Sequence, residues 1–336
     1  MLCFGPSSPW PDVDGQNRTL PVLTERTAAV TFDVQRVGIL FPGQGAQVPG
    51  MGKALSERAS LARELFDQAN EILGYDLAQL CFEGPAEKLN QTEFCQPALF
   101  VTGIAAAKVY ADEQPEMAQR IVAAAGLSLG EYTAVCFADG LDFADALRLV
   151  QRRGQAMQAA ADAVESGMSS VVGLDLEQVT AVCDAARQDD EILRPANLLC
   201  PGNIATSGHL SALARLEPLA SEAGAMKVIP LSVAGAFHTD LMAPAVDQLK
   251  QALQEMPIRD TRIPVYSNVD ASPHQKADEI RDLLTRQVVN PVLWEASIRR
   301  MMDDGVEGFL ESGTGRVLRG TLKRINRKFP TDGFGD

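Results

Sequence analysis

The chain alternates short, continuously apolar runs with longer segments in which apolar residues recur every three or four positions. Residues 37–41 and 121–125 are apolar runs of the first kind, and residues 63–74 show the longer spacing. Short continuous runs predict strands buried on both faces, and the longer spacing predicts amphipathic helices. We therefore expect an α/β fold with a mainly parallel sheet flanked by helices.

Residues 165–233 follow a different order of elements. Their apolar pattern predicts a strand, a helix, two strands about a turn, a second helix and a last strand. This β-α-β-β-α-β order is typical of a small ferredoxin-like unit. Because the parallel pattern resumes at "IPVYSNV", we expect a large subdomain over 37–164 and 234–330, with an inserted α+β subdomain at 165–233.

Residues 1–36 contain four prolines, scattered polar residues and no sustained period. Such composition predicts a loose tail, which can also arise from an upstream start codon. The alternative is that Trp10 docks on the folded body. A basic start followed by a long apolar stretch is absent, so the segment does not predict a secretory signal.

Composition narrows the class of protein. The 336 residues are 46% hydrophobic and 22% charged, which is ordinary for a globular enzyme. The formal net charge of −14 argues against a nucleic-acid binder and a polybasic membrane protein. The six cysteines show no metal-ligand spacing, so we expect no bound metal and reduced thiols in a cytoplasmic protein. We also expect a monomer.

A serine stands where one predicted strand meets the next helix. Ser128 lies midway between Gly126 and Gly130, in the pattern Gly-x-Ser-x-Gly. A tight strand-to-helix turn exposes the middle side chain, and glycines two positions away leave room for the turn. The helix that follows directs free N–H groups toward the serine oxygen. The pattern predicts a nucleophile, although it also arises by chance.

A serine nucleophile needs a base, and the chain has three histidines. His209 opens a predicted helix, and His274 lies in a polar turn. His238 follows the last strand of the inserted unit, which makes it the candidate base, against the alternative of a structural hydrogen-bonding role. Since no acidic residue stands out as a third member, we expect a Ser–His dyad in which a backbone carbonyl holds the histidine.

The second predicted helix after the serine, in "DFADALRLVQRRGQAMQAAAD", carries an arginine on its apolar stripe. Arg153 falls three residues after Val150 and four before Met157, both on that stripe. A lone buried charge costs several kcal/mol, so Arg153 needs a partner. The partner is either a structural carboxylate or, next to a nucleophilic serine, the carboxylate of a substrate.

The loop after the first strand reads "FPGQGAQ", with Gln44 between two glycines. It fits neither a dinucleotide fingerprint, because Val48 stands where a glycine is needed, nor a phosphate-binding loop. The simplest interpretation is a strand-to-helix turn. The alternative is that its N–H faces Ser128, because loops after parallel strands open at the same sheet edge.

Seven segments occur in an order that resembles the malonyl-CoA:acyl carrier protein transacylases, an acyltransferase family of fatty-acid synthesis. They are "FPGQGAQ", "GLSLGEY", "QRRGQAMQ", "GAFH", "YSNV", "NPVLW" and "ESGTGRVLRGTLKRI", within residues 37–330. The resemblance implies an α/β-hydrolase-like large subdomain with a ferredoxin-like insert. It also implies cofactor-free ping-pong transfer of malonyl from coenzyme A to the phosphopantetheine thiol of an acyl carrier protein. It implies that Ser128 is the nucleophile, His238 the general base, and Arg153 the group that binds the malonyl carboxylate.

The same resemblance implies roles for the surrounding residues. The N–H groups of Gln44 and Leu129 would form the oxyanion hole, and the carbonyl of Gln287 would orient the histidine. Phe237 would leave little room for an α-methyl branch, and Asn197 would contact the acyl group.

The sequence also departs from the family pattern. Leu127 stands where the family usually has histidine before the serine. In "NLLCPGN" the chain keeps Asn197, but Leu199, Cys200 and Asn203 replace the usual residues. These changes weaken the expectation of amide contacts and leave the strictness of malonyl selectivity open.

Other functions remain as alternatives at this stage. A serine thioesterase or esterase shares the Gly-x-Ser-x-Gly turn but does not need a buried arginine, and a non-catalytic scaffold does not need Ser128, His238 and Arg153 together. A transacylase could instead serve a polyketide-like pathway.

Carrier recognition raises a question of charge, because acyl carrier proteins are acidic and this chain carries −14. Residues 312–329 contain six Lys or Arg and no Asp or Glu. We expect one helical face to present four of them to the carrier, the alternative being a merely solvated face: Arg316, Arg319, Lys323 and Arg327.

Overall fold

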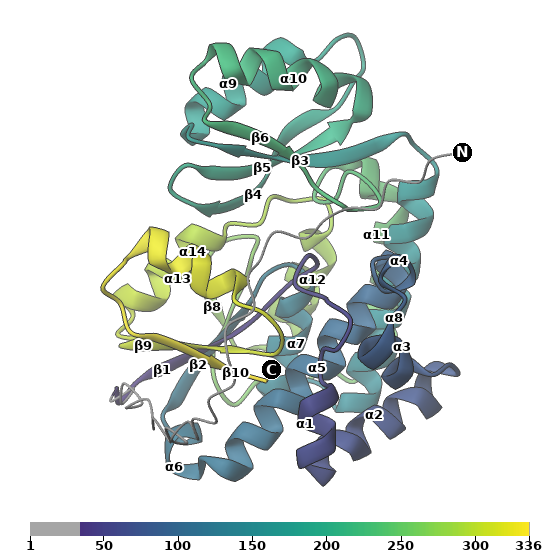
Figure 1. The fold of residues 1–336 in the computed structure, drawn as a ribbon, viewed down its shortest axis with the longest axis vertical. Coiled ribbons are helices and arrows are strands. Elements are labelled where there is room, and N and C mark those ends of the chain that lie inside the picture. The colour runs from purple at the N-terminus through teal and green to yellow at the C-terminus, as the bar shows by residue number, and fades with distance from the viewer. Residues whose placement is uncertain (1–33, 336) are drawn as a thin grey trace, which may run out of the picture. The chain divides into compact units, whose positions relative to one another are not determined.

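The computed structural model describes residues 34–335. The predictions made for residues 1–33, including the docking of Trp10, lie outside the described part. The described residues form two sheets with helices packed against them (Figure 1).

The larger sheet has six strands in the order β10-β9-β1-β2-β7-β8. Every neighbouring pair is parallel except β7 and β8. This agrees with the mainly parallel sheet predicted from the apolar runs. Its strands are β1 Val37–Phe41, β2 Ile121–Gly126, β7 Val265–Tyr266, β8 Pro273–His274, β9 Gly308–Ser312 and β10 Thr331–Phe334.

The two faces of this sheet are buried against different helices. Successive side chains of a strand point to opposite faces, so Ile39 and Phe41 join one core while Leu40 joins the other. The first face is covered by α2 (Ser60–Leu73), α5 (Thr92–Glu113), α7 (Leu129–Phe137), α8 (Phe143–Asp162) and α11 (Ala243–Glu255), and the second by α13 (Trp294–Asp303) and α14 (Val317–Ile325) (Figure 1).

The helices of the larger part run as follows: α1 Lys53–Arg58, α2 Ser60–Leu73, α3 Leu77–Glu83, α4 Ala86–Leu89, α5 Thr92–Glu113, α6 Pro115–Ala118, α7 Leu129–Phe137, α8 Phe143–Asp162, the 3-10 turn η1 Asp240–Met242, α11 Ala243–Glu255, α12 Ala277–Gln287, α13 Trp294–Asp303 and α14 Val317–Ile325.

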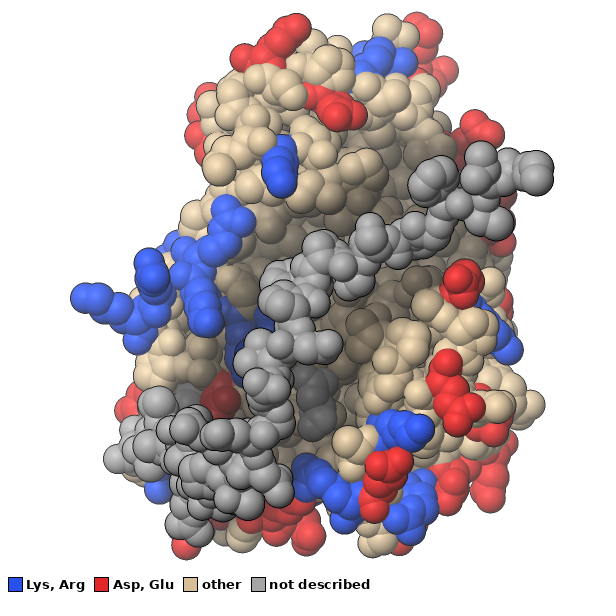
Figure 2. All heavy atoms as spheres, viewed as in Figure 1, with Lys and Arg blue, Asp and Glu red and all other residues tan. Residues whose placement is uncertain are grey.

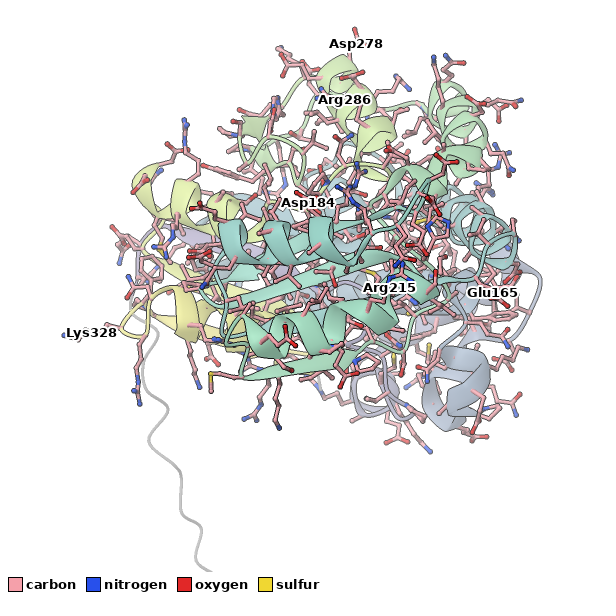
Figure 3. All side chains as sticks on the ribbon, turned by 90° about the horizontal axis from the view of Figure 1, so that it is seen from above. Glu165, Asp184, Arg215, Asp278, Arg286 and Lys328 are labelled. Carbon is pink, nitrogen blue, oxygen red and sulfur yellow. The ribbon has the colours of Figure 1, made fainter. Side chains whose placement is uncertain are left out.

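The smaller sheet is antiparallel, with strand order β4-β5-β3-β6. Helices α9 and α10 lie side by side over one face of it, as both views show (Figures 1 and 3). Its elements follow the predicted β-α-β-β-α-β order: β3 Ser166–Val172, α9 Leu176–Ala186, β4 Leu193–Cys200, β5 Asn203–His209, α10 Leu210–Glu222 and β6 Lys227–Pro230.

The smaller sheet also contacts the larger part of the protein. Asn197 in β4 forms an isolated bridge with Val292, and the N–H of Leu198 donates to the carbonyl of Val292 at 2.9 Å. These bonds fix β4 beside the segment that precedes α13, so residues of both sheets can line one cavity.

Helix α5 is long and apolar enough to cross a membrane by length and composition alone. However, 78% of its most apolar window is buried within the protein. Burial of this kind is what a central helix of a globular core shows.

The ends of the folded body differ from the expected 37–330. Val34 is already buried, and the N–H of Gln35 donates to Glu307 at 2.8 Å. At the other end, β10 adds an edge strand beyond residue 330, paired in parallel with β9.

Candidate active site

Ser128 lies at the turn between β2, which ends at Gly126, and α7, which begins at Leu129. Its backbone has φ 52° and ψ −103°, a conformation that non-glycine residues rarely adopt. A Cβ on Gly126 would lie 1.8 Å from the carbonyl carbon of Gly130, and one on Gly130 would lie 2.1 Å from the Phe41 oxygen. The two glycines therefore permit the close approach that the turn requires, as the sequence predicted.

His238 contacts the serine directly. The Ser128 hydroxyl and His238 Nε2 are 2.8 Å apart, and Nδ1 lies 2.9 Å from the carbonyl oxygen of Gln287. Since that carbonyl can only accept, Nδ1 carries the proton and Nε2 is left to accept from the serine hydroxyl. Burial, followed by the charge of Arg153, lowers the pKa of His238 to about 4, which keeps the imidazole neutral.

Arg153 on α8 is buried, with 1% of its surface exposed. Nη1 donates to Gln96 Oε1 at 2.7 Å, and Nη2 donates to both Ser128 Oγ and Gln287 Oε1 at 3.0 Å. Its guanidinium also lies over the ring of Tyr132, 5.0 Å from the centroid.

The charge of Arg153 has no carboxylate partner at ion-pair distance within residues 34–335. Its Nε is buried and makes no hydrogen bond. The partners of the guanidinium are neutral amides and a hydroxyl. The structural ion pair considered from the sequence is therefore absent from the described residues.

These side chains border a cleft with a cavity volume of about 60 Å³. Gln44, Leu129, Phe237 and Asn197, to which the resemblance gave roles around the acyl group, all line it. Asn197 Oδ1 is buried without a hydrogen-bond partner. The remaining lining residues come from loops and helices of the larger part, from β3 and from the segment after β6: Gly43, Gln96, Leu127, Ser128, Arg153, Met157, Met168, Leu231, Val233 and His238.

The loop after β1 lies against the serine turn. A Cβ on Gly43 would be 2.4 Å from the carbonyl oxygen of Leu127, so only glycine allows this approach. The contact brings Gln44 to the same cleft as Leu129, the first residue of α7, whose N–H has no acceptor within the helix.

Among Leu127, Leu199, Cys200 and Asn203, which depart from the family pattern, only Leu127 lines this cleft. Asn203 accepts a hydrogen bond from Ser170 at 2.7 Å inside the smaller sheet. Leu199 and Cys200 pack with the core around α13 and α14.

Sequence reasoning missed three polar residues that hold the site. Gln96 accepts from Arg153, Asn268 Oδ1 accepts from the Ser128 N–H at 2.7 Å, and Glu131 accepts from Gln287 Nε2 at 2.6 Å. A signal existed for Gln96, which is a polar residue within an otherwise apolar helical segment. Asn268 and Glu131 lie inside the segments "YSNV" and "GLSLGEY", but no pattern in the sequence pairs them.

The predicted basic face is only partly present. Helix α14 ends at Ile325, so Arg316 and Arg327 lie outside it, and Arg319 is paired with the buried Glu311 at 3.3 Å. The prediction of one helical face was therefore wrong. Exposed cations nevertheless gather over α14 and its two ends (Figure 2): Arg316, Lys323, Arg324, Arg327 and Lys328.

No group of His, Cys, Asp or Glu within residues 34–335 could hold a metal ion. The five described cysteines are free and buried.

A serine with a neutral histidine at its hydroxyl and a buried cation beside it has the parts of a serine-dependent acyl-transfer site. The family description "Acyl transferase domain" matches residues 39–324. A malonyl CoA-acyl carrier protein transacylase of Bacillus subtilis is 40% identical over 305 residues, 90% of this chain and 94% of the relative.

Solved structures agree with this comparison. The transacylase of the same name from Coxiella burnetii superposes with a TM-score of 0.86 at 35% identity, over 90% of this chain and 94% of that one. A malonyl-transacylase in complex with its type II polyketide-synthase acyl-carrier protein has a TM-score of 0.86 at 36% identity, over 90% and 96%. This chain therefore belongs to the malonyl-CoA:acyl carrier protein transacylases of the acyl transferase family, as its motifs indicated.

Proposed function

We propose that this acyltransferase moves malonyl from malonyl-CoA to the phosphopantetheine thiol of an acyl carrier protein, through a malonyl ester on Ser128. The product would supply fatty-acid chain elongation. The observation that carries the proposal is Arg153, a buried cation beside Ser128 Oγ with an unused Nε and neutral partners.

The first half-reaction begins at the serine. His238 Nε2 takes the hydroxyl proton while Ser128 Oγ attacks the thioester carbonyl. The N–H groups of Gln44 and Leu129 bind the developing oxyanion, and the tetrahedral intermediate collapses to release coenzyme A, whose sulfur takes the proton from His238.

The second half-reaction reverses these roles. The carrier thiol gives its proton to His238 Nε2, its sulfur attacks the malonyl ester, and Ser128 Oγ recovers the proton as the ester bond breaks. The Gln287 carbonyl holds His238 Nδ1 in both halves, which keeps the tautomer unchanged.

Arg153 selects the acyl group. A malonyl carboxylate offers it the anionic partner that residues 34–335 do not provide, through charge-assisted hydrogen bonds. The small cavity, narrowed by Phe237, favours a short unbranched acyl chain, and the unpaired Asn197 Oδ1 offers an acceptor within the same cleft.

The remaining features of the proposal are coarser. We assign an α/β-hydrolase-like subdomain to residues 37–164 and 234–330 and a ferredoxin-like one to residues 165–233, which the strand order β4-β5-β3-β6 supports. We propose a cytoplasmic monomer without cofactor that docks its carrier on the exposed cations around α14.

Two alternative functions remain distinguishable by experiment. A carrier of a polyketide-like pathway is favoured by the relative solved with such a carrier. A thioesterase would hydrolyse the acyl-enzyme instead of transferring it, and Arg153 argues against it because hydrolysis of a neutral acyl group has no use for a buried cation.

Intact-mass measurement tests the proposal. Malonyl-CoA should add one malonyl group to the wild-type chain and none to Ser128→Ala, and adding holo carrier should remove the label as malonyl-carrier. Arg153→Ala should lose malonyl selectivity by roughly 2–4 kcal/mol, while acetyl labelling falls less or rises. The matched control is Arg152→Ala, because Arg152 is exposed and pairs with Glu255. Label on Ser128→Ala, or release as free malonate in place of malonyl-carrier, would overturn the proposal.

A further inference from the structure

Behind the cleft lies a buried carboxylate to which the mechanism gives no task. Glu131 is in the first turn of α7, has 3% of its surface exposed, and does not line the cavity. Its Oε2 accepts from Gln287 Nε2 at 2.6 Å and from the Asn268 N–H at 3.1 Å. Burial raises the pKa of Glu131 to about 7, which means that ionising this carboxyl group in the core costs free energy.

A first set of hydrogen bonds connects Glu131 through Gln287 to Arg153 and His238. Gln287 Nε2 also donates to the Ser128 carbonyl at 3.0 Å, which commits its N–H₂ group to two acceptors. Its Oε1 must then face the other way, where it accepts from Arg153 Nη2. The carbonyl of the same residue accepts from His238 Nδ1.

A second set of hydrogen bonds connects Glu131 through Asn268 to Ser128. The Asn268 N–H donates to Glu131, and its side chain binds both ends of the strained turn. Oδ1 accepts from the Ser128 N–H at 2.7 Å, and Nδ2 donates to the Gly126 carbonyl at 2.8 Å. These bonds hold the positive φ of Ser128.

We infer that Glu131 is a positioning residue that sets the orientation of the Gln287 amide and of Asn268, and thereby places Arg153, His238 and Ser128 for the transfer of a carboxylated acyl group. One carboxylate links the nucleophile, the base and the cation through two amides, without touching the substrate.

The hydrogen-bond inventory explains why a carboxylate is needed. Both groups facing Glu131 Oε2 are donors, and a carboxylate offers them an acceptor oxygen in either orientation. A glutamine at this position has one acceptor oxygen and one N–H₂ group, so Glu131→Gln weakens both hydrogen bonds by removing the charge. In one of its two orientations its N–H₂ group also faces the Gln287 amide, which can relieve the clash by turning over. Its own N–H₂ would then face the guanidinium of Arg153, which loses its acceptor.

The test compares Glu131→Gln with Glu311→Gln. Glu311 is a second buried carboxylate, which accepts from the N–H groups of Leu318 and Arg319 and lies outside the cleft. Ser128 labelling by malonyl-CoA and by acetyl-CoA is followed by intact mass, with melting temperature measured in parallel.

Glu131→Gln should slow malonyl labelling on the order of tenfold and reduce the malonyl-to-acetyl rate ratio severalfold. Glu311→Gln should lower the melting temperature and leave the ratio at the wild-type value. A wild-type ratio in folded Glu131→Gln would overturn the inference and leave Glu131 a merely structural residue.

Should Glu131→Gln fail to fold, Glu131→Asp takes its place. A carboxylate one methylene shorter cannot reach both donors, so the ratio should again fall, and an unchanged ratio would overturn the inference. The inference rests on the proposed roles of Ser128 and Arg153. Failure of the Ser128 role would appear as a wild-type protein that malonyl-CoA does not label, and failure of the Arg153 role as a wild-type malonyl-to-acetyl ratio in Arg153→Ala.

Discussion

His238 shares its buried site with a permanent cation, and the pair determines when the base can work. Burial lowers the histidine pKa to about 4, and the charge of Arg153 contributes in the same direction. The imidazole is therefore neutral, and able to accept the serine proton, from neutral pH down to mildly acidic pH. In the unfolded chain His238 has its ordinary pKa of about 6.5. As the pH falls from that value toward about 4, the unfolded chain binds a proton that the native histidine does not, so the contribution of His238 to the free energy of unfolding is lost.

Removal of the cation should move the acidic limb of the pH profile upward. In Arg153→Met the second cause of the lowered pKa is gone while burial remains, so the His238 pKa rises but stays below its ordinary value. The measurement is the rate of Ser128 labelling by acetyl-CoA, which carries no carboxylate, between pH 4 and 8.

Arg152→Met is the matched control, because its neighbour Arg152 is exposed and pairs with Glu255. The control should keep the wild-type profile. An acidic limb that is identical in Arg153→Met and wild type would show that the charge of Arg153 does not act on His238.

Sequence reasoning reached the residues to which the family resemblance gives a role, and it missed other residues of the same motifs that only the fold brings together. Ser128 is recognisable because its two glycines indicate the tight turn. Glu131 meets Asn268 and Gln287 across more than a hundred positions of the chain, and their polar types are ordinary at each place. Their importance arises from burial and from each other, which the sequence does not show.

The turn between β2 and α7 depends on space as much as on backbone freedom. A Cβ at Gly130 would meet backbone atoms of Phe41 and Pro42, which cannot move without disturbing β1. Ser128 can therefore lie beside the loop after β1 only because residue 130 has no side chain.

Gly130→Ala should therefore reduce Ser128 labelling by malonyl-CoA more than tenfold and lower the melting temperature by several degrees, since overpacking typically costs about 1–3 kcal/mol. The control is Gly320→Ala in α14, where a Cβ would meet nothing within 4 Å. That change should raise the melting temperature, because alanine in a helix is more stable than glycine by roughly 0.5–1 kcal/mol. Similar behaviour of the two variants would contradict this account of the turn.

Two elements escaped prediction for physical reasons. β10 is a short edge strand, "TDGF", whose stability comes from pairing with β9 and not from an apolar pattern. Helix α14 stops at Ile325, before Asn326, although the spacing of basic residues continues to Arg327. Charge spacing alone does not mark a helix end, which here is the extended backbone of Asn326, with φ −150° and ψ 100°.

At the scale of the whole molecule, the net charge of −14 opposes an acidic carrier unless the contact surface has the opposite sign. The exposed cations around α14 offer such a surface (Figure 2). Lys328 points outward at the edge of this region, away from the elements that carry Asp278 and Arg286 (Figure 3).

Reversing Lys323 and Arg327 to Glu should raise the KM for the carrier severalfold, with a larger effect at low salt, because charge pairs at an exposed surface are screened. Labelling by malonyl-CoA should change little. Arg319 is left out of the variant, since its pairing with Glu311 is structural.

The control for total charge reverses Arg148 and Lys276, which are exposed on α8 and before α12. It should leave the carrier KM near wild type. Equal losses of activity with malonyl-CoA and with the carrier would indicate that the cations around α14 bind the coenzyme phosphates. No loss with either substrate would indicate that they form only a solvated surface.

The hydrogen bond from Arg153 to Ser128 Oγ links recognition to reactivity in the proposed mechanism. In the empty site, one lone pair of the serine oxygen is shared with a cation, which makes that oxygen a poorer nucleophile. A carboxylate that binds Arg153 competes for the same Nη2 and releases the lone pair for attack. An acyl group without a carboxylate leaves the bond in place. Discrimination then acts on kcat as well as on KM, because the correct substrate also activates the atom that it will be joined to.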